Sequence, residues 1–261
     1  MNVKIIVLVV AAALVALGGY LYYDHTHPPA EAPASAAAPA TPPAESPPEP
    51  QYPVPGTETP DAAPLPAIDD SDAAMHDALV NVFGAAANDL IVPDSLVRRI
   101  VATIDALPRK KLAARMRPVT PAPGKLVVEN PEGDMALGAD NYARYAPFVS
   151  LLEGADTSQL VQLYLRFYPR FQQAYVQLGY PSGYFNDRLV EAIDDMLAAP
   201  EVEGPIALSR PNVLYEYTDP DLEARSVGQK VLLRVGPENA AAIKAKLREI
   251  RSQVTSQAPQ A

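Results

Sequence analysis

Residues 158–179 read SQLVQLYLRFYPRFQQAYVQLG, a stretch in which large apolar side chains recur every three or four positions. The recurring residues are Leu160, Leu163, Tyr164, Phe167, Phe171, Tyr175 and Leu178. This spacing places them on one face of a helix that begins near Ser158 and ends at Gly179. Pro169 lies in its middle and removes one backbone N–H, so we expect a kink there. A helix with so much apolar surface must pack against other elements, which predicts a mainly α domain.

Helical periodicity continues on both sides of this stretch. Further helices are expected to begin after caps at 69–71, at Pro93, near Tyr142, at an Asn186 cap, at Pro220 and at Pro237. The helix from Pro93 should stop at Leu107, before Pro108. Minor β structure is expected at 125–129 and in two runs, 206–208 and 213–217, which could pair as a short hairpin. The prediction is a compact multi-helix domain with minor β structure.

Composition divides the 261-residue chain into an N-terminal apolar segment, a linker, a domain and a tail. Proline and alanine dominate 24–67, and proline fixes φ and lacks the backbone donor, so this part is expected to be a disordered linker. The helical domain is expected at 68–255 and a flexible tail at 256–261. Within the linker, PPEP at 47–50 fits the PxxP pattern of docking peptides, although a semi-rigid spacer is the preferred interpretation.

The N-terminal segment at 5–23 is apolar and uncharged, and its length is close to the roughly 20 residues that cross a bilayer. Lys4 precedes it and the next basic residue is Arg98, so the positive-inside rule keeps residues 1–4 cytoplasmic and exports the rest. We therefore expect a single-pass transmembrane helix, a signal anchor in the inner (plasma) membrane, with the domain in the periplasm. A signal peptide cleaved near Gly18 is the alternative, and it too would export the domain.

Charge and residue types argue against several functional classes. The net charge of −10 argues against nucleic-acid binding, which usually needs a basic surface. The chain has no cysteine, which excludes a thiol nucleophile and Cys-ligated metal. Its histidines are His25, His27 and His76, and none has further ligands at metal-binding spacings, so no metal site or cofactor is expected. Nothing in the sequence indicates an oligomeric state.

The segment GYPSGYFNDR at 179–188 is the main candidate for a binding site. Aromatic and arginine side chains on a loop that leads into a helix are typical of recognition surfaces. The candidate residues are Tyr180, Tyr184, Asn186, Asp187 and Arg188. A purely structural interpretation is also open, with Asn186 as the helix cap and the tyrosines buried in the core.

Two other charged groups have both a functional and a plain interpretation. Glu191, Asp194 and Asp195 lie at helical spacing and could act as an acid and base pair beside Tyr184, as in glycoside hydrolases, or form a solvated helix face. A basic island follows the predicted helix end at 107, where it complements the helix dipole but could also meet an acidic partner or lipid headgroups. Its members are Arg109, Lys110, Lys111, Arg115 and Arg117.

Several sequence blocks resemble a bacterial family known only as domain of unknown function 3014. The blocks are IDDSD at 68–72, LVRRIVATIDALP at 96–108, NYARY at 141–145, GYPSGYFNDR at 179–188, PEVEGP at 200–205, VLYEY at 213–217 and GPENA at 236–240. The resemblance spans the whole predicted domain. It implies a membrane-anchored protein of Gram-negative bacteria, and it brings neither an activity nor site residues.

Taken together, the sequence favours a non-enzymatic, membrane-anchored envelope protein whose exported helical domain binds a protein partner, while 5–23 contacts the lipid bilayer. The alternative is a cell-wall glycan-directed hydrolase or glycan-binding module that uses the Glu191, Asp194 and Asp195 carboxylates.

Overall fold

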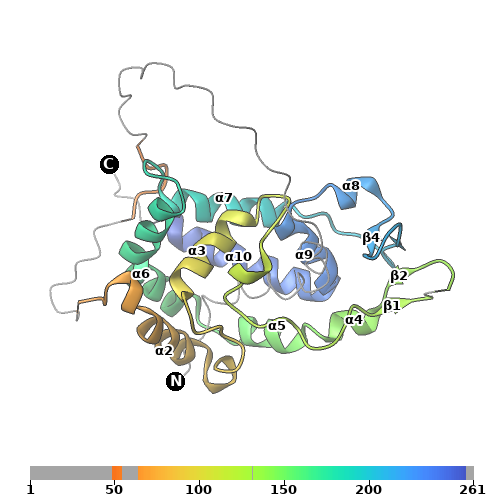
Figure 1. Cartoon of the computed structure of the whole chain (residues 1–261), viewed down its shortest axis with the longest axis horizontal. Helices are drawn as coiled ribbons and strands as arrows, with labels where there is room; N and C mark the ends of the chain where they lie inside the picture. Colours follow the sequence, from red (N-terminus) through yellow and green to blue (C-terminus); the bar gives the residue numbers. More distant parts are fainter. Residues whose placement is uncertain (1–48, 55–63, 131, 257–261) are drawn as a thin grey trace, which may run out of the picture.

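The computed structural model describes residues 49–54, 64–130 and 132–256, and within these it contains nine α-helices and two antiparallel hairpins (Figure 1). The helices are α2 (Asp72–Phe83), α3 (Leu96–Ala106), α4 (Ala139–Ala143), α5 (Ala146–Glu153), α6 (Thr157–Gln177), α7 (Phe185–Leu197), α8 (Pro220–Glu223), α9 (Val227–Val235) and α10 (Pro237–Thr255). The strands are β1 (Val128–Glu129), β2 (Ala136–Leu137), β3 (Leu208–Ser209) and β4 (Glu216–Tyr217). The predicted mainly α domain with minor β structure is confirmed.

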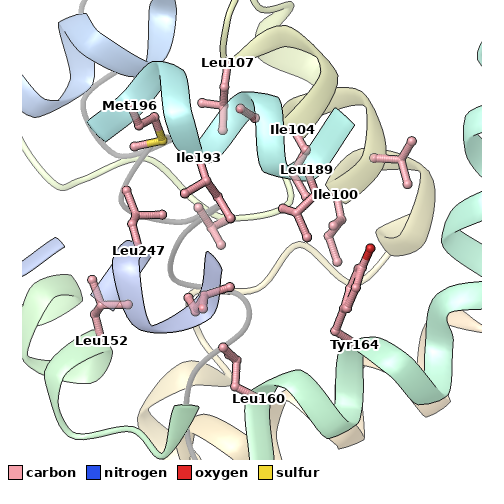
Figure 2. Packing of buried hydrophobic residues seen from close by; sticks show 14 of the residues in the cluster. Ile100, Ile104, Leu107, Leu152, Leu160, Tyr164, Leu189, Ile193, Met196 and Leu247 are labelled. Atoms are coloured by element: carbon pink, nitrogen blue, oxygen red, sulfur yellow. The ribbon is translucent and has the colours of Figure 1, made fainter. Parts of the chain in front are cut away.

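The helical body, which we define as α2, α3, α5, α6, α7, α9 and α10, holds the main core. Helix α10 contacts α5, α6, α7 and α9, and α3 contacts α2, α6 and α7. Figure 2 shows side chains from these helices converging, among them Leu160 and Tyr164 of α6, Ile193 of α7 and Leu247 of α10. Leu160 and Leu247 are completely buried, and burying such a side chain contributes about 1.5–3 kcal/mol. The apolar periodicity of the sequence therefore accounts for how the body packs.

The helix predicted to begin near Ser158 and to end at Gly179 is confirmed as α6, which continues through Pro169. Asp156 caps it, because its Oδ1 accepts the N–H groups of Ser158 and Gln159 at 2.8 and 3.1 Å. The kink at Pro169 stays a prediction.

The predicted helix starts after 69–71, at Pro220 and at Pro237 are confirmed by α2, α8 and α10, whereas the start at Pro93 is wrong, because a side chain from another helix supplies the cap. The second helix begins at Leu96 and not at Pro93, since the Asp72 carboxylate accepts the N–H groups of Ser95 and Leu96 at 2.6 and 2.7 Å. Ser71 precedes α2 but does not cap it, because its hydroxyl donates to the Ile68 carbonyl instead.

Two predicted helices are each divided into two. The expected helix at 220–235 is α8 and α9, because Ser226 lies between them and its hydroxyl oxygen accepts the Gln229 N–H as a new cap. The expected helix from Tyr142 is α4 and α5, and Pro147 lies in the first turn of α5, where its missing N–H costs nothing.

The hairpin lobe, which we define as β1, β2, β3, β4 and α8, lies at one end of the molecule (right in Figure 1). Val128 pairs with Leu137 and Leu208 with Tyr217, and a bridge from Ala136 to Ala207 joins the two hairpins. This confirms the hairpin expected near 206–217 and gives the 125–129 run a partner that the sequence did not reveal. The lobe has a small apolar cluster of its own, made of Leu137, Ile206, Leu208, Tyr217, Leu222 and Leu233.

The membrane helix expected at 5–23 lies outside the described residues, and no helix within them is long and apolar enough to span a bilayer. Two pieces of the expected linker, 49–54 and 64–67, lie against the body. Arg170 of α6 donates to the carbonyls of Pro66 and Leu65 at 2.6 and 3.0 Å. Proline-rich backbone lacks donors but keeps its acceptors, so side-chain donors of the body can hold it in an extended form.

Candidate functional site

The 179–184 loop and the first turns of α7 border an open hollow of about 430 Å³, which we call the Arg188 hollow. Its lining includes Tyr180, Tyr184, Asp187 and Arg188, which are four of the five candidates from the sequence. It also includes Asp105 and Arg109, which belong to the end of α3 and the turn after it. The structure thus brings most of the predicted residues together.

The fifth candidate, Asn186, lies inside the body, and its predicted role as a helix cap is wrong. Helix α7 begins one residue earlier, at Phe185, whose N–H is accepted by Gln172 Oε1 of α6 at 2.8 Å. The Asn186 side chain is completely buried: its Oδ1 accepts the Tyr164 hydroxyl at 2.9 Å, and its Nδ2 donates to the Val254 carbonyl at 3.3 Å.

Gln172 also fixes the loop itself. Its Nε2 donates to the Gly183 carbonyl at 2.7 Å, so one side chain of α6 holds both the loop and the start of α7. Gly183 is required here, because a Cβ at this position would lie 2.9 Å from the Tyr175 ring. The loop is therefore a rigid platform, which suits a recognition surface.

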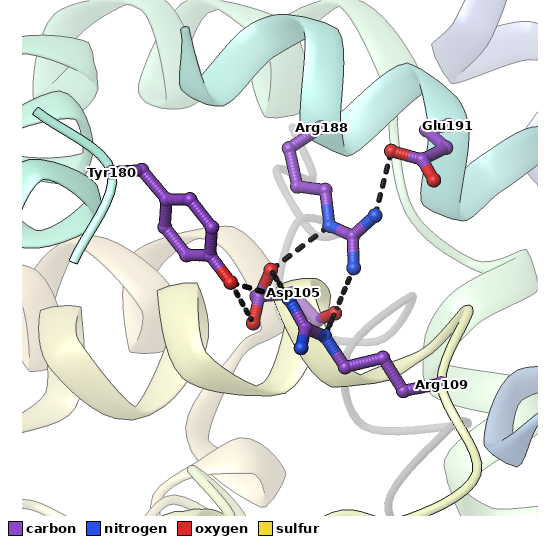
Figure 3. A network of polar contacts seen from close by, with 5 residues as sticks. All are labelled: Asp105, Arg109, Tyr180, Arg188 and Glu191. Carbon is purple, nitrogen blue, oxygen red and sulfur yellow. Dashed lines mark hydrogen bonds and ion pairs between the residues drawn. The ribbon is translucent and has the colours of Figure 1, made fainter. Parts of the chain in front are cut away.

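Figure 3 shows a polar network on the floor of the Arg188 hollow, centred on the Asp105 carboxylate. Its Oδ1 accepts from Arg188 Nε at 3.0 Å and from an Arg109 terminal nitrogen at 3.1 Å. Its Oδ2 accepts the Tyr180 hydroxyl at 3.4 Å. Arg188 also pairs with Glu191 at 2.6 Å, and Arg109 donates to the Tyr180 hydroxyl. Each charge in the network thus has an opposite partner, which allows it to lie partly out of water.

Asp105 is a residue whose role the sequence analysis missed. A carboxylate in the last turn of a helix lies against the negative end of the helix dipole, and that of Asp105 is only 10% exposed. Arg188 and Arg109 offset this cost from α7 and from the turn after α3. The signal was present in LVRRIVATIDAL, where an acidic residue follows directly on the apolar residues that form the buried face.

Stacked tyrosines form another wall of the Arg188 hollow. The Tyr175 and Tyr180 rings lie 4.4 Å apart at an interplanar angle of 17°. Burial, with the Asp105 charge as a smaller cause, raises the pKa of Tyr175 to about 12, so its hydroxyl stays neutral at physiological pH. The wall thus combines flat aromatic surface with fixed polar atoms.

The end of the predicted linker also reaches this site. The two Asp187 carboxylate oxygens accept the N–H groups of Gln51 and Tyr52 at 3.0 and 2.8 Å. Asn186 Nδ2 donates to the Tyr52 carbonyl at 2.8 Å. Residues 49–54 therefore lie along the N-terminal part of α7, and the docking of this segment on its own domain was not predicted.

The three carboxylates considered for hydrolysis border a second open hollow of about 520 Å³, which we call the Asp194 hollow, but each has its own partner. Glu191 pairs with Arg188, and Asp194 pairs with Arg251 of α10 at 2.5 Å. Asp195 accepts from the Ser226 hydroxyl and from Gln229, and burial raises its pKa. The carboxylates thus point toward three different helices or turns and do not face one another as an acid–base pair would.

The remaining candidates are dispersed. His76 lies 3.7 Å from the Asp77 carboxylate, and within the described residues no three potential metal ligands come together. In the basic island, Arg109 belongs to the Arg188 hollow, Lys110 contacts the Ala224 carbonyl and Arg117 donates to the Ala114 carbonyl, so these three have different partners.

Comparison with known proteins gives one match. No curated protein and no solved structure matches the chain. A family model described as "Protein of unknown function (DUF3014)" matches residues 96–251, which is more than half of the chain and includes α3, the 179–184 loop, α7 and most of α10. The chain belongs to the DUF3014 family of proteins of unknown function.

Proposed function

We propose that this protein is a non-enzymatic envelope protein whose helical domain binds a protein partner through the Arg188 hollow. One observation carries the proposal: Arg109, Tyr180 and Arg188 are held in fixed positions around Asp105 at an open surface. Tyrosine and arginine are enriched among the residues that dominate binding energy at protein interfaces. Groups already held by the free protein lose little conformational entropy on binding, which favours affinity.

Anchoring is the second part of the proposal. The apolar run at 5–23, with Lys4 before it and no further basic residue until Arg98, supports a single-pass anchor in the inner membrane and a periplasmic domain. An alkaline phosphatase domain fused after Ala261 should be active in intact cells, because this enzyme requires export. An inactive fusion, produced at a normal level, would contradict the topology without bearing on the binding face.

The binding face is tested by chemical crosslinking of the full-length protein in native membranes, followed by mass spectrometry of what it captures. The test variant is Arg109→Ala with Tyr184→Ala, both at the Arg188 hollow. A matched control is Arg210→Ala with Tyr215→Ala in the hairpin lobe, where the Arg210 guanidinium lies 5.3 Å from the centre of the Tyr215 ring. The two variants remove the same residue types, one pair from the Arg188 hollow and the other from the hairpin lobe.

We expect one envelope protein to be captured in near-stoichiometric amount by the wild type and by the lobe control, and to be lost with the hollow variant. Equal capture by both variants, or no specific capture at all, would overturn the proposal. Binding or cleavage of purified cell wall by the wild type, lost on Asp195→Asn, would instead favour the glycan-directed alternative.

A further inference from the structure

The docked segment 49–54 points to a binding site of a defined kind. We propose that the start of α7 is a binding site for a proline-flanked peptide with a bend in its main chain, and that the chain's own residues 49–54 fill it as an internal ligand that an incoming peptide must displace. The inference rests on the proposed function in one respect only, namely that the incoming peptide belongs to a protein partner. The site itself is inferred from the contacts that hold residues 49–54.

The site binds main-chain groups of the docked segment. Asp187 accepts two successive backbone N–H groups, from Gln51 and Tyr52, and Asn186 donates to the Tyr52 carbonyl. Three main-chain groups of two adjacent residues are therefore paired by two adjacent side chains. Such pairing needs a main chain that turns two successive N–H groups to the same side, as the bend at Gln51 and Tyr52 does, and it makes no demand on the side chains.

The pair is pre-organised by the core. The Tyr164 hydroxyl and the Val254 carbonyl hold the buried Asn186 amide from behind, at 2.9 and 3.3 Å. Asp187 lies in the first turn of α7, where the helix dipole stabilises a negative charge.

Selectivity comes from the residues around the paired groups. Pro50 and Pro53 flank Gln51 and Tyr52, and because proline restricts the backbone, it lowers the entropy lost on binding. Tyr52 packs against the core of the body and lies beside Arg251, whose pKa is raised chiefly by Asp194 and further by Tyr52. Glu49 borders the Arg188 hollow with its two arginines. The sequence EPQYP thus describes the peptide class: an acidic residue, followed by a glutamine and a tyrosine that lie between two prolines.

The internal ligand is held by few contacts, so an incoming peptide can displace it. Gln51 is exposed, and Tyr52 is the residue of the segment that packs against the main core. Gln51 and Asp187 border both the Arg188 hollow and the Asp194 hollow, so removal of the segment would join the two along α7. Because the segment is covalently tethered, its effective concentration is on the order of millimolar, and a free peptide binds well only when the internal one is weakened.

The test uses the full-length protein, purified in detergent, and a fluorescent synthetic peptide with the sequence of residues 47–56, PPEPQYPVPG. A loosened variant carries Gln51→Pro, which removes one N–H donor, and Tyr52→Ala, which removes the packing side chain. A third protein adds Asp187→Asn to the loosened variant, with nearly the same side-chain shape and one acceptor oxygen fewer. Fluorescence anisotropy gives the affinity, and circular dichroism confirms that all three proteins are folded.

We expect the loosened variant to bind the peptide at least about tenfold more tightly than the wild type, and the added Asp187→Asn to remove that gain. A peptide with Gln51→Pro should fail to bind the loosened variant. Equal binding by all three proteins, or no binding by any, would overturn the inference. Partner capture that depends on Arg109 and Tyr184 can fail while this peptide binds, and the peptide can fail to bind while the partner is captured. The two experiments therefore test the proposed function and this inference separately.

Discussion

The helical body and the hairpin lobe are stabilised in different ways. In the body, long amphipathic helices such as α6 and α10 present continuous apolar faces to one another, and the core is shared by all of them. In the lobe, each strand has two residues, and the apolar cluster has six buried members. Short hairpins are not stable by themselves, so the lobe depends on its contacts with α9, to which Leu233 belongs.

This difference indicates where precise geometry can be maintained. Both the Arg188 hollow and the Asn186–Asp187 pair are built on α3, α6 and α7, and their side chains are held by buried core residues. A site on such a support keeps its shape in the free protein, whereas the lobe is the part we expect to open first. The predictions below compare residues in the body with matched residues in the lobe, or in α4, which follows β2 of the lobe and precedes α5 of the body.

The largest difference is expected from two leucines. Leu160→Ala in α6 removes a completely buried side chain from the body, and should lower the free energy of unfolding by about 4 kcal/mol. Leu137→Ala in β2, equally apolar and 2% exposed, should cost about 2 kcal/mol, because the small lobe can close around the gap. Urea unfolding followed by far-ultraviolet circular dichroism measures both values. Equal losses would show that the lobe and the body share one cooperative core.

Two completely buried asparagines give the next comparison. Asn186→Ala leaves the buried Tyr164 hydroxyl without its acceptor and should cost about 2 kcal/mol. Asn141→Ala in α4 releases the Arg234 carbonyl, the Val127 N–H and Arg144, and should cost about 1 kcal/mol, because the half-buried Arg144 regains water. The same urea titration applies. A larger loss at Asn141 would mean that the junction between lobe and body is the stronger polar contact.

The sequence predicted the helical body well, because the apolar spacing of residues such as Leu160, Phe167, Ile193 and Leu247 is a local signal that the core then confirms. It predicted helix starts less well. Asn186 has the residue type of a cap, but the N–H that needed an acceptor was satisfied by Gln172 from another helix. A cap supplied from a distance cannot be recognised in the local sequence.

The candidate site shows the same limit. Tyr180, Tyr184, Asp187 and Arg188 were recognised from the loop that carries them, and they do line one hollow. Asp105 was missed because its role in the polar network depends on Arg188, which is distant in the sequence and contacts Asp105 only in the folded protein. The docked segment was missed because Asp187 and Tyr52 are 135 positions apart, and a proline-rich composition describes the segment's conformation but not its contacts.

The smallest effect in the comparison concerns two buried tyrosines at alkaline pH. Burial raises the pKa of Tyr217 in the lobe to about 12 and raises that of Tyr164 in the body well above its ordinary value. An unfolded tyrosine ionises near pH 10, so the unfolded chain loses its proton first and the stability due to each residue falls as the pH rises above about 10.

At pH 11, Tyr217→Phe should therefore recover about 1 kcal/mol of the stability that the wild type loses between pH 9 and pH 11. The hydroxyl of Tyr217 donates to the Lys230 carbonyl at 3.3 Å, so at pH 8 the same variant should be slightly less stable than the wild type. If the lobe opens by itself, the tyrosinate absorbance that Tyr217→Phe removes from the wild type will appear at a lower pH than the loss of helical signal, whereas the absorbance that Tyr164→Phe removes will appear together with that loss. Simultaneous changes in both signals would show that the lobe opens only when the body unfolds.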